Sequence, residues 1–177
     1  METNDPFVIL GLPARFDLRE ADVRAAWLRR SAALHPDRAD ANAGMDEAER
    51  ARAAAVLNDA KRTLEDPERR ADALLLRLGG ATKEQDKSIP PEVLMEMMEA
   101  RETLEQAASA GDAAALDGSR AWAEERRAGH IERVGDLFAR AGDPPDAAAL
   151  RAVRAELNAW RYVERMLEQI DAPPASG

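Results

Sequence analysis

Cysteine is absent from this chain, and histidine occurs only at His35 and His130. Without a thiol, the chain forms no disulfide, offers no thiol nucleophile and cannot bind zinc or an iron–sulfur cluster through cysteine. Aromatic residues make up 4% of the 177 residues, and no apolar run approaches the roughly 18 residues of a membrane-spanning helix. The opening residues also lack the basic start and apolar run of a secretory signal. These absences predict a soluble, cytoplasmic protein without a metal site or a cofactor.

Basic residues are also fewer than acidic ones. The 25 lysines and arginines face 34 aspartates and glutamates, which gives a formal net charge of −9. A chain this acidic has no global attraction for nucleic acid or for an anionic membrane, so an anionic partner must bind to a local basic patch. The acidity is uneven, because residues 1–78 carry a net charge of −2 and residues 79–177 a net charge of −7.

Strand-forming residues are sparse, whereas the helix formers alanine, arginine, glutamate and leucine recur throughout. The pattern predicts an all-α fold in which glycine and proline mark the helix ends. The expected helices span residues 6–10, 18–34, 46–64, 68–78, 92–110, 112–141 and 146–170. The segment 79–91 is polar and aperiodic, so we expect it to be an interdomain linker. The other predicted parts are an N-terminal helical domain over residues 1–78, a three-helix bundle over residues 92–172 and a tail over residues 173–177.

Apolar spacing predicts which side chains lie in the core of the first domain. In the helix 18–34, which we expect Asp17 to cap, the inward residues are Val23, Trp27 and Leu34. In the two helices that follow, the inward residues are Val56, Leu57, Ala60, Leu64, Leu74, Leu75 and Leu78. In the second half of the chain, His130 is expected on a helix surface.

The tripeptide His35-Pro36-Asp37 stands between the helices 18–34 and 46–64. By itself it is a weak signal, because three given residues often occur together by chance. Its context is more specific: the following helix ends in the pattern N-x-A-x-x-x-L-x-D-P-x-x-R, from Asn58 to Arg70. Together, the tripeptide and this helix end resemble a J-domain, a helical hairpin with an HPD loop, over residues 4–78.

The resemblance implies a co-chaperone that docks on a DnaK-type chaperone and stimulates its ATP hydrolysis. Pro36 excludes a continuing helix, and Asp37 is suited to a charge-assisted contact with an arginine of the chaperone. His35 is no plausible catalytic base, since no serine, cysteine or metal constellation is recognisable around it, and we expect no enzyme activity. The expected chaperone-binding residues are the tripeptide and the nearby arginines, Arg24, Arg29, Arg30 and Arg38.

The helix 92–110 has more apolar residues than one buried face requires. At about 100° per residue, a core stripe is formed by Val93, Met97, Ala100, Leu104 and Ala107. Leu94, Met95 and Met98 form a second apolar strip that points away from the bundle interior and is bordered by Glu99 and Glu102. Exposed apolar residues with an acidic rim are common in protein-docking surfaces. Helix geometry leaves open the alternative that a neighbouring helix or the first domain covers this strip.

The segment LMEMMEARETLE within this helix resembles the client-binding helix of the HscB family, J-proteins of iron–sulfur cluster biogenesis, and the resemblance extends over residues 4–171. It implies an HscA- or DnaK-type chaperone and an IscU-type scaffold protein as partners, without nucleic acid or membrane. The implied scaffold-binding residues are Leu94, Met95, Met98, Glu99, Glu102, Arg161 and Tyr162. Gln106 replaces an acid that the family pattern often has. If Trp160 faces the core, Tyr162 faces outward.

Three alternatives accompany this interpretation. One is a J-domain co-chaperone with a different client protein. Another is a helical structural or regulatory module with a degenerate J-like half, which would leave the chaperone ATPase unchanged. The third is a di-iron site inside a carboxylate-rich bundle, which needs Glu-x-x-His pairs. The bundle offers only His130, and no glutamate stands three residues before it, so it does not meet this requirement.

Overall fold

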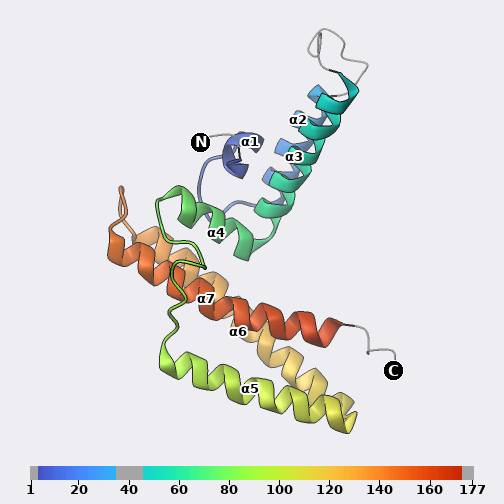
Figure 1. Cartoon of the computed structure of the whole chain (residues 1–177), viewed down its shortest axis with the longest axis vertical. Coiled ribbons are helices and arrows are strands. Elements are labelled where there is room, and N and C mark those ends of the chain that lie inside the picture. Colours follow the sequence, from blue (N-terminus) through green and yellow to red (C-terminus); the bar gives the residue numbers. More distant parts are fainter. Residues whose placement is uncertain (1–3, 35–45, 173–177) are drawn as a thin grey trace. The chain divides into compact units, whose positions relative to one another are not determined.

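The computed structural model describes residues 4–34 and 46–172, and within these ranges it is helical, as the composition predicted (Figure 1). The helices are α1 (Pro6–Leu10), α2 (Glu20–Ala33), α3 (Glu47–Glu65), α4 (Pro67–Arg77), α5 (Pro91–Ala110), α6 (Ala113–Arg140) and α7 (Ala147–Asp171). Each bound lies within two residues of the predicted one. The chain divides into two compact units between Arg77 and Leu78.

The start of α2 differs from the prediction. Asp17 does not cap this helix: the N-cap residue is Arg19, which makes no capping hydrogen bond with its side chain. Phe16 and Leu18 are buried just before the helix, and the chain turns helical only after it has placed them in the core. In contrast, α3 begins with a capping box, in which Asp46 and Glu49 each accept a hydrogen bond from the other's backbone N–H.

The core of the first unit contains most of the predicted side chains, among them Val23, Leu57, Ala60, Leu64, Leu74 and Leu75. Trp27 was predicted to be core but is only half-buried. Its indole N–H needs a partner, and Nε1 donates to Asn58 Oδ1 at 2.9 Å, at the edge of the α2–α3 hairpin. Val56 is also outside the core, because its neighbour Leu57 takes the inward direction of α3. Leu34 is half-buried and Leu78 exposed, so these two predictions were also wrong.

The pattern at the end of α3 has a structural explanation. Asp66 Oδ1 accepts from the backbone N–H of Arg69 at 3.0 Å and so caps the start of α4. Arg70 is buried and donates from Nη1 to the carbonyl of Leu64 at 2.7 Å. Its guanidinium carbon lies 5.3 Å from the centre of the Phe16 ring. Burial lowers the pKa of Arg70. Arg70 therefore ties the end of α3 to α4 and to the loop before α2.

The second unit is a bundle of α5, α6 and α7, in which α5 and α7 lie side by side and both contact α6 (Figure 1). One core cluster joins the three helices through Met97, Leu104, Ala123, Val163, Met166 and Leu167. The predicted core stripe of α5 is confirmed: Met97, Leu104 and Ala107 are buried, and Val93 and Ala100 pack against the cluster. No helix in the described ranges is both long and apolar enough to cross a membrane.

His130 corrects a prediction for this unit. It was expected on a helix surface, but only 3% of it is exposed. Its ring stacks on that of Trp160, with 6.5 Å between the ring centroids, and its Nδ1 is hydrogen-bonded to Glu156 of α7. A buried imidazole is tolerated here because a carboxylate on the neighbouring helix satisfies it.

The segment before α5 is bound to α7. The buried side chain of Arg154 donates from Nε to the carbonyl of Ala81 at 2.9 Å. Asn158 donates from Nδ2 to the carbonyls of Asp86 and Ser88, at 3.0 Å each. Residues 81–88 are therefore part of the second unit.

Candidate functional site

Four of the residues expected to bind a chaperone lie outside the described residues: His35, Pro36, Asp37 and Arg38. Their contribution to the site rests on the sequence motif.

The three remaining arginines are exposed on α2, but they do not share one face. Arg24, Arg29 and Arg30 are separated by roughly 100–140° around the helix. Arg30 lies against the end of α1: a Cβ on Gly11, whose φ is +65°, would be 2.6 Å from its Nη2. Arg30 thus covers the glycine that ends α1. Arg24 shares its face with Leu28, one turn further on, which is 53% exposed.

The apolar strip on α5 is exposed. Leu94 is 39% exposed, Met95 63% and Met98 64%, whereas Met97 in the core stripe is 7% exposed. None of the described helices of the bundle covers them. Such exposure of three large apolar side chains on adjoining turns is typical of a protein-docking surface.

Two carboxylates of α5 border the strip, and a third lies on the opposite side of the helix. Glu99 and Glu102 are exposed on the outer side of α5. Glu102 Oε1 accepts from Gln106 Nε2 at 3.2 Å, so Gln106 orients an acid although it carries no charge itself. Glu96, by contrast, forms an ion pair with Arg126 of α6. Residue spacing placed Glu99 and Glu102 on this rim, but it held no signal for the role of Gln106.

Tyr162 is the exposed aromatic residue of α7. It is 41% exposed and Trp160 is fully buried, as the spacing predicted. Glu164 pairs with Arg127 and Asp171 with Arg120, both on α6. Tyr162 lies about 160–180° around α7 from these two acids, beside Met166, which packs in the cluster with α5. Tyr162 therefore borders the seam between α5 and α7.

Leu94 and Met98 border the same seam. Both lie about 160° around α5 from Glu96, the residue that pairs with α6. They are accordingly on the side of α5 that faces α7, so Leu94, Met98 and Tyr162 lie along one line of contact between two helices.

Arg161, expected on this surface, takes a different direction. Its Nη1 donates to Glu168 Oε1 at 3.0 Å. Arg165, which sequence reasoning missed, has its guanidinium carbon 5.9 Å from the centre of the Tyr162 ring. The three-residue separation of Tyr162 and Arg165 was the available signal, since residues so spaced on a helix are neighbours.

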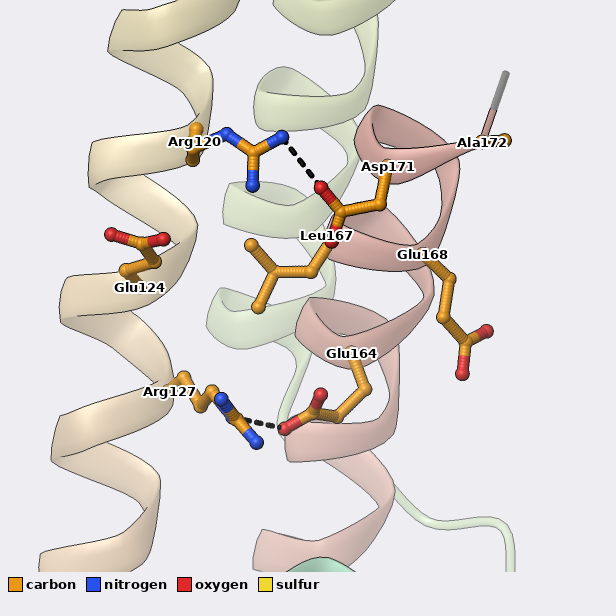
Figure 2. Close-up of a pocket in the computed structure, with 8 residues that line it drawn as sticks. All are labelled: Arg120, Glu124, Arg127, Glu164, Leu167, Glu168, Asp171 and Ala172. Carbon is orange, nitrogen blue, oxygen red and sulfur yellow. Dashed lines mark hydrogen bonds and ion pairs between the residues drawn. The ribbon is translucent and has the colours of Figure 1, made fainter.

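Glu168 lines a groove on the other edge of α7, between α6 and α7 (Figure 2). Two ion pairs span this groove, Arg120 with Asp171 at 2.6 Å and Arg127 with Glu164 at 2.7 Å. Its charged groups thus largely satisfy one another. Among the described residues, no group of three or more histidines and acids is placed to hold a metal ion.

Comparisons with known proteins extend over nearly the whole chain. A family model described as "HSCB C-terminal oligomerisation domain" matches residues 89–171. The co-chaperone protein HscB homolog of Burkholderia multivorans is 34% identical over 167 residues, which are 94% of this chain and 91% of that protein. The homolog of Bordetella parapertussis is 31% identical over 173 residues, 97% of each chain.

Two solved structures have a similar fold. Chaperone HscB from Vibrio cholerae matches with a TM-score of 0.71 and 26% identity, covering 94% of this chain and 95% of that one. The crystal structure of human co-chaperone protein HscB matches with a TM-score of 0.75, covering 96% and 82%. At 22% identity, the second match shows a similar fold and nothing further.

Proposed function

The chain belongs to the HscB co-chaperone family, and from that premise we propose that it stimulates ATP hydrolysis by an HscA/DnaK-type chaperone and delivers an IscU-type scaffold protein to it. Members of this family are co-chaperones and not enzymes. The proposal gives each unit one partner: the chaperone for the first, the scaffold for the second.

The observation that carries the client half is the exposed strip of Leu94, Met95 and Met98 on α5. Burial of these side chains against a partner removes apolar surface from water, and methionine adapts to an irregular partner surface. Glu99 and Glu102 at the rim select a client with basic side chains opposite them. Tyr162 extends the apolar surface across the seam to α7, and Arg161 is the basic residue beside it in the sequence.

The chaperone half rests on His35-Pro36-Asp37 and on the arginines near it. Asp37 pairs with an arginine of the chaperone in a charge-assisted contact. Arg24, Arg29, Arg30 and Arg38 give this part of an acidic chain a local excess of positive charge, which attracts an acidic cleft on the chaperone. Arg24 and Arg29 are exposed on α2.

Two sites on one chain bring two partners together. Once the scaffold is bound to the second unit, it is held at a high effective concentration near a chaperone bound to the first. The co-chaperone thereby acts as a bridge, and it needs no chemistry of its own. The absence of cysteine fits this role, because the chain cannot compete with the scaffold for a cluster through thiolate ligands.

Two measurements test the proposal. Tagged chain, used as bait in an extract of its source cell, should retain an IscU-type scaffold, and a DnaK-type chaperone should hydrolyse ATP faster when the purified chain is added. Retention of another client with normal ATPase stimulation would replace the scaffold half with the alternative of a different client. Unchanged ATP hydrolysis would refute the co-chaperone activity itself.

A further inference from the structure

The surface that we assign to the scaffold has a basic side as well as an acidic one. Arg165 is exposed on α7, and its guanidinium lies over the ring of Tyr162. In the part of the chain that the structure describes, no carboxylate lies within ion-pair distance of Arg165. Arg161 differs in this respect, because its guanidinium forms an ion pair with Glu168, two turns further along α7. Of the two arginines, Arg165 is the one directed to the client surface.

Charge is therefore divided along the seam between α5 and α7. Glu99 and Glu102 lie on the outer side of α5, with Leu94 and Met98 between them and α7. Arg165 lies beyond Tyr162 on α7. The order across the surface is acid, apolar centre, base.

We propose that Arg165, placed over the ring of Tyr162, is a specificity-determining contact that binds a carboxylate of the client. The proposal rests on the proposed function, since it refines the scaffold-binding surface. The client surface that fits has an apolar centre. Its basic side chains face α5, and an acidic side chain faces α7.

The physical reason lies in the preorganisation of Arg165. An exposed arginine loses side-chain entropy when it binds, and this loss makes most surface ion pairs weak. The cation–π contact with the Tyr162 ring already restricts the guanidinium. Its N–H groups have no carboxylate partner among the described residues, so they stay available to one from the client. A charge so placed excludes clients that present a basic residue at this point, which is a gain in specificity more than in affinity.

The test measures the affinity of the full chain for an IscU-type scaffold by calorimetry. Arg165→Glu should weaken binding about tenfold and Arg165→Ala about threefold, as expected for loss or reversal of one exposed ion pair. Arg165→Ala should also make the affinity less sensitive to salt. Arg151→Glu makes the same charge change at an exposed position of α7 fourteen residues away and should leave the affinity within about twofold of the unmodified chain.

The outcomes distinguish a failure of this inference from a failure of the proposed function. If Arg165→Glu binds as tightly as the unmodified chain, or if Arg151→Glu weakens binding as much, Arg165 is not the specific contact. Leu94→Ala with Met98→Ala, measured in parallel, reports on the client surface itself. Weak binding by that double variant beside normal binding by Arg165→Glu overturns only the inference, whereas normal binding by both refutes the assigned client surface.

Discussion

Glu156 Oε1 lies 2.6 Å from His130 Nδ1, so a carboxylate of α7 and an imidazole of α6 are hydrogen-bonded inside the bundle. Arg133 Nε donates to the same oxygen at 2.6 Å. With the Nδ1–H donating to Glu156, the 3.0 Å approach of Arg133 Nη2 to that nitrogen is a contact and not a further hydrogen bond. Burial by itself would raise the pKa of Glu156, but the hydrogen bonds from His130 and Arg133 outweigh it and lower that pKa.

The first prediction concerns stability and pH. A carboxylate with a lowered pKa in the folded chain stabilises the fold above its ordinary pKa, 4.5 for Glu156, and this stabilisation is lost as the pH falls through the folded value. Glu156→Gln should lower the free energy of unfolding at neutral pH by about 1.5–3 kcal/mol, as for loss of a charged hydrogen bond. The difference from the unmodified chain should shrink below about pH 4.5.

Denaturant unfolding at a series of pH values measures this difference. Glu132→Gln, a change at an exposed glutamate of α6, serves as the control and should match the unmodified chain throughout. A difference that stays constant from neutral to acid pH would show that the charge of Glu156 does not contribute to stability.

The second prediction concerns the segment 81–88. Asn158→Ala removes two hydrogen bonds to its backbone, so the segment should detach more often from α7. Lys83 and Lys87 lie in the segment and are exposed, and trypsin should cleave after them several times faster in the variant. Asn58→Ala in the first unit should leave this cleavage unchanged. Equal rates in all three chains would mean that Asn158 does not hold the segment.

The third prediction tests the HPD motif. His35→Gln should abolish stimulation of the chaperone ATPase, because the motif is the expected chaperone contact. Circular dichroism and the midpoint of thermal unfolding should match those of the unmodified chain. Normal stimulation by a correctly folded variant would contradict the role given to His35.

The fourth prediction tests the strip on α5. Leu94→Ala with Met98→Ala should weaken scaffold binding by about tenfold or more, since each side chain loses apolar area that the partner would bury. Stimulation of the chaperone ATPase without client should not change. Leu76→Ala is a matched control, because Leu76 is a leucine of similar exposure, 41%, on α4. Normal affinity of the double variant would place the client site elsewhere.

The fifth prediction concerns the acidic rim. Scaffold affinity should fall as salt is added, because ions screen the attraction between exposed charges. Glu99→Gln with Glu102→Gln should make that dependence shallower, and Glu105→Gln, whose carboxylate pairs with Arg101, should have a smaller effect. A salt titration that is flat for the unmodified chain would exclude an electrostatic role for the rim.

Residue spacing correctly predicted several features that are determined within a single helix. Helix bounds, the buried stripe of α5 and the opposite orientations of Trp160 and Tyr162 follow from residue spacing, and the structure confirms them. The exposure of Leu94 needed the arrangement of the bundle as well, because spacing alone left open whether another helix covers it.

Two predictions were wrong because a partner on another helix decides the outcome. Trp27 is held at the hairpin edge by Asn58, thirty-one residues away, and His130 is buried because Glu156 is placed to accept from it. Neither pairing leaves a periodic signal. The direction of Arg165 toward Tyr162, and of Arg161 toward Glu168, likewise depends on rotamers that spacing does not specify.

The hydrogen bonds between α7 and the segment 81–88 have a consequence for the evolution of this chain. Arg154 and Asn158 bind main-chain carbonyls, those of Ala81, Asp86 and Ser88. A main-chain carbonyl is the same whichever residue carries it, so most side chains of the segment are open to mutational drift. Selection on this connection acts instead on two positions some seventy residues downstream, and a label could be grafted into the segment while Arg154 and Asn158 preserve its path.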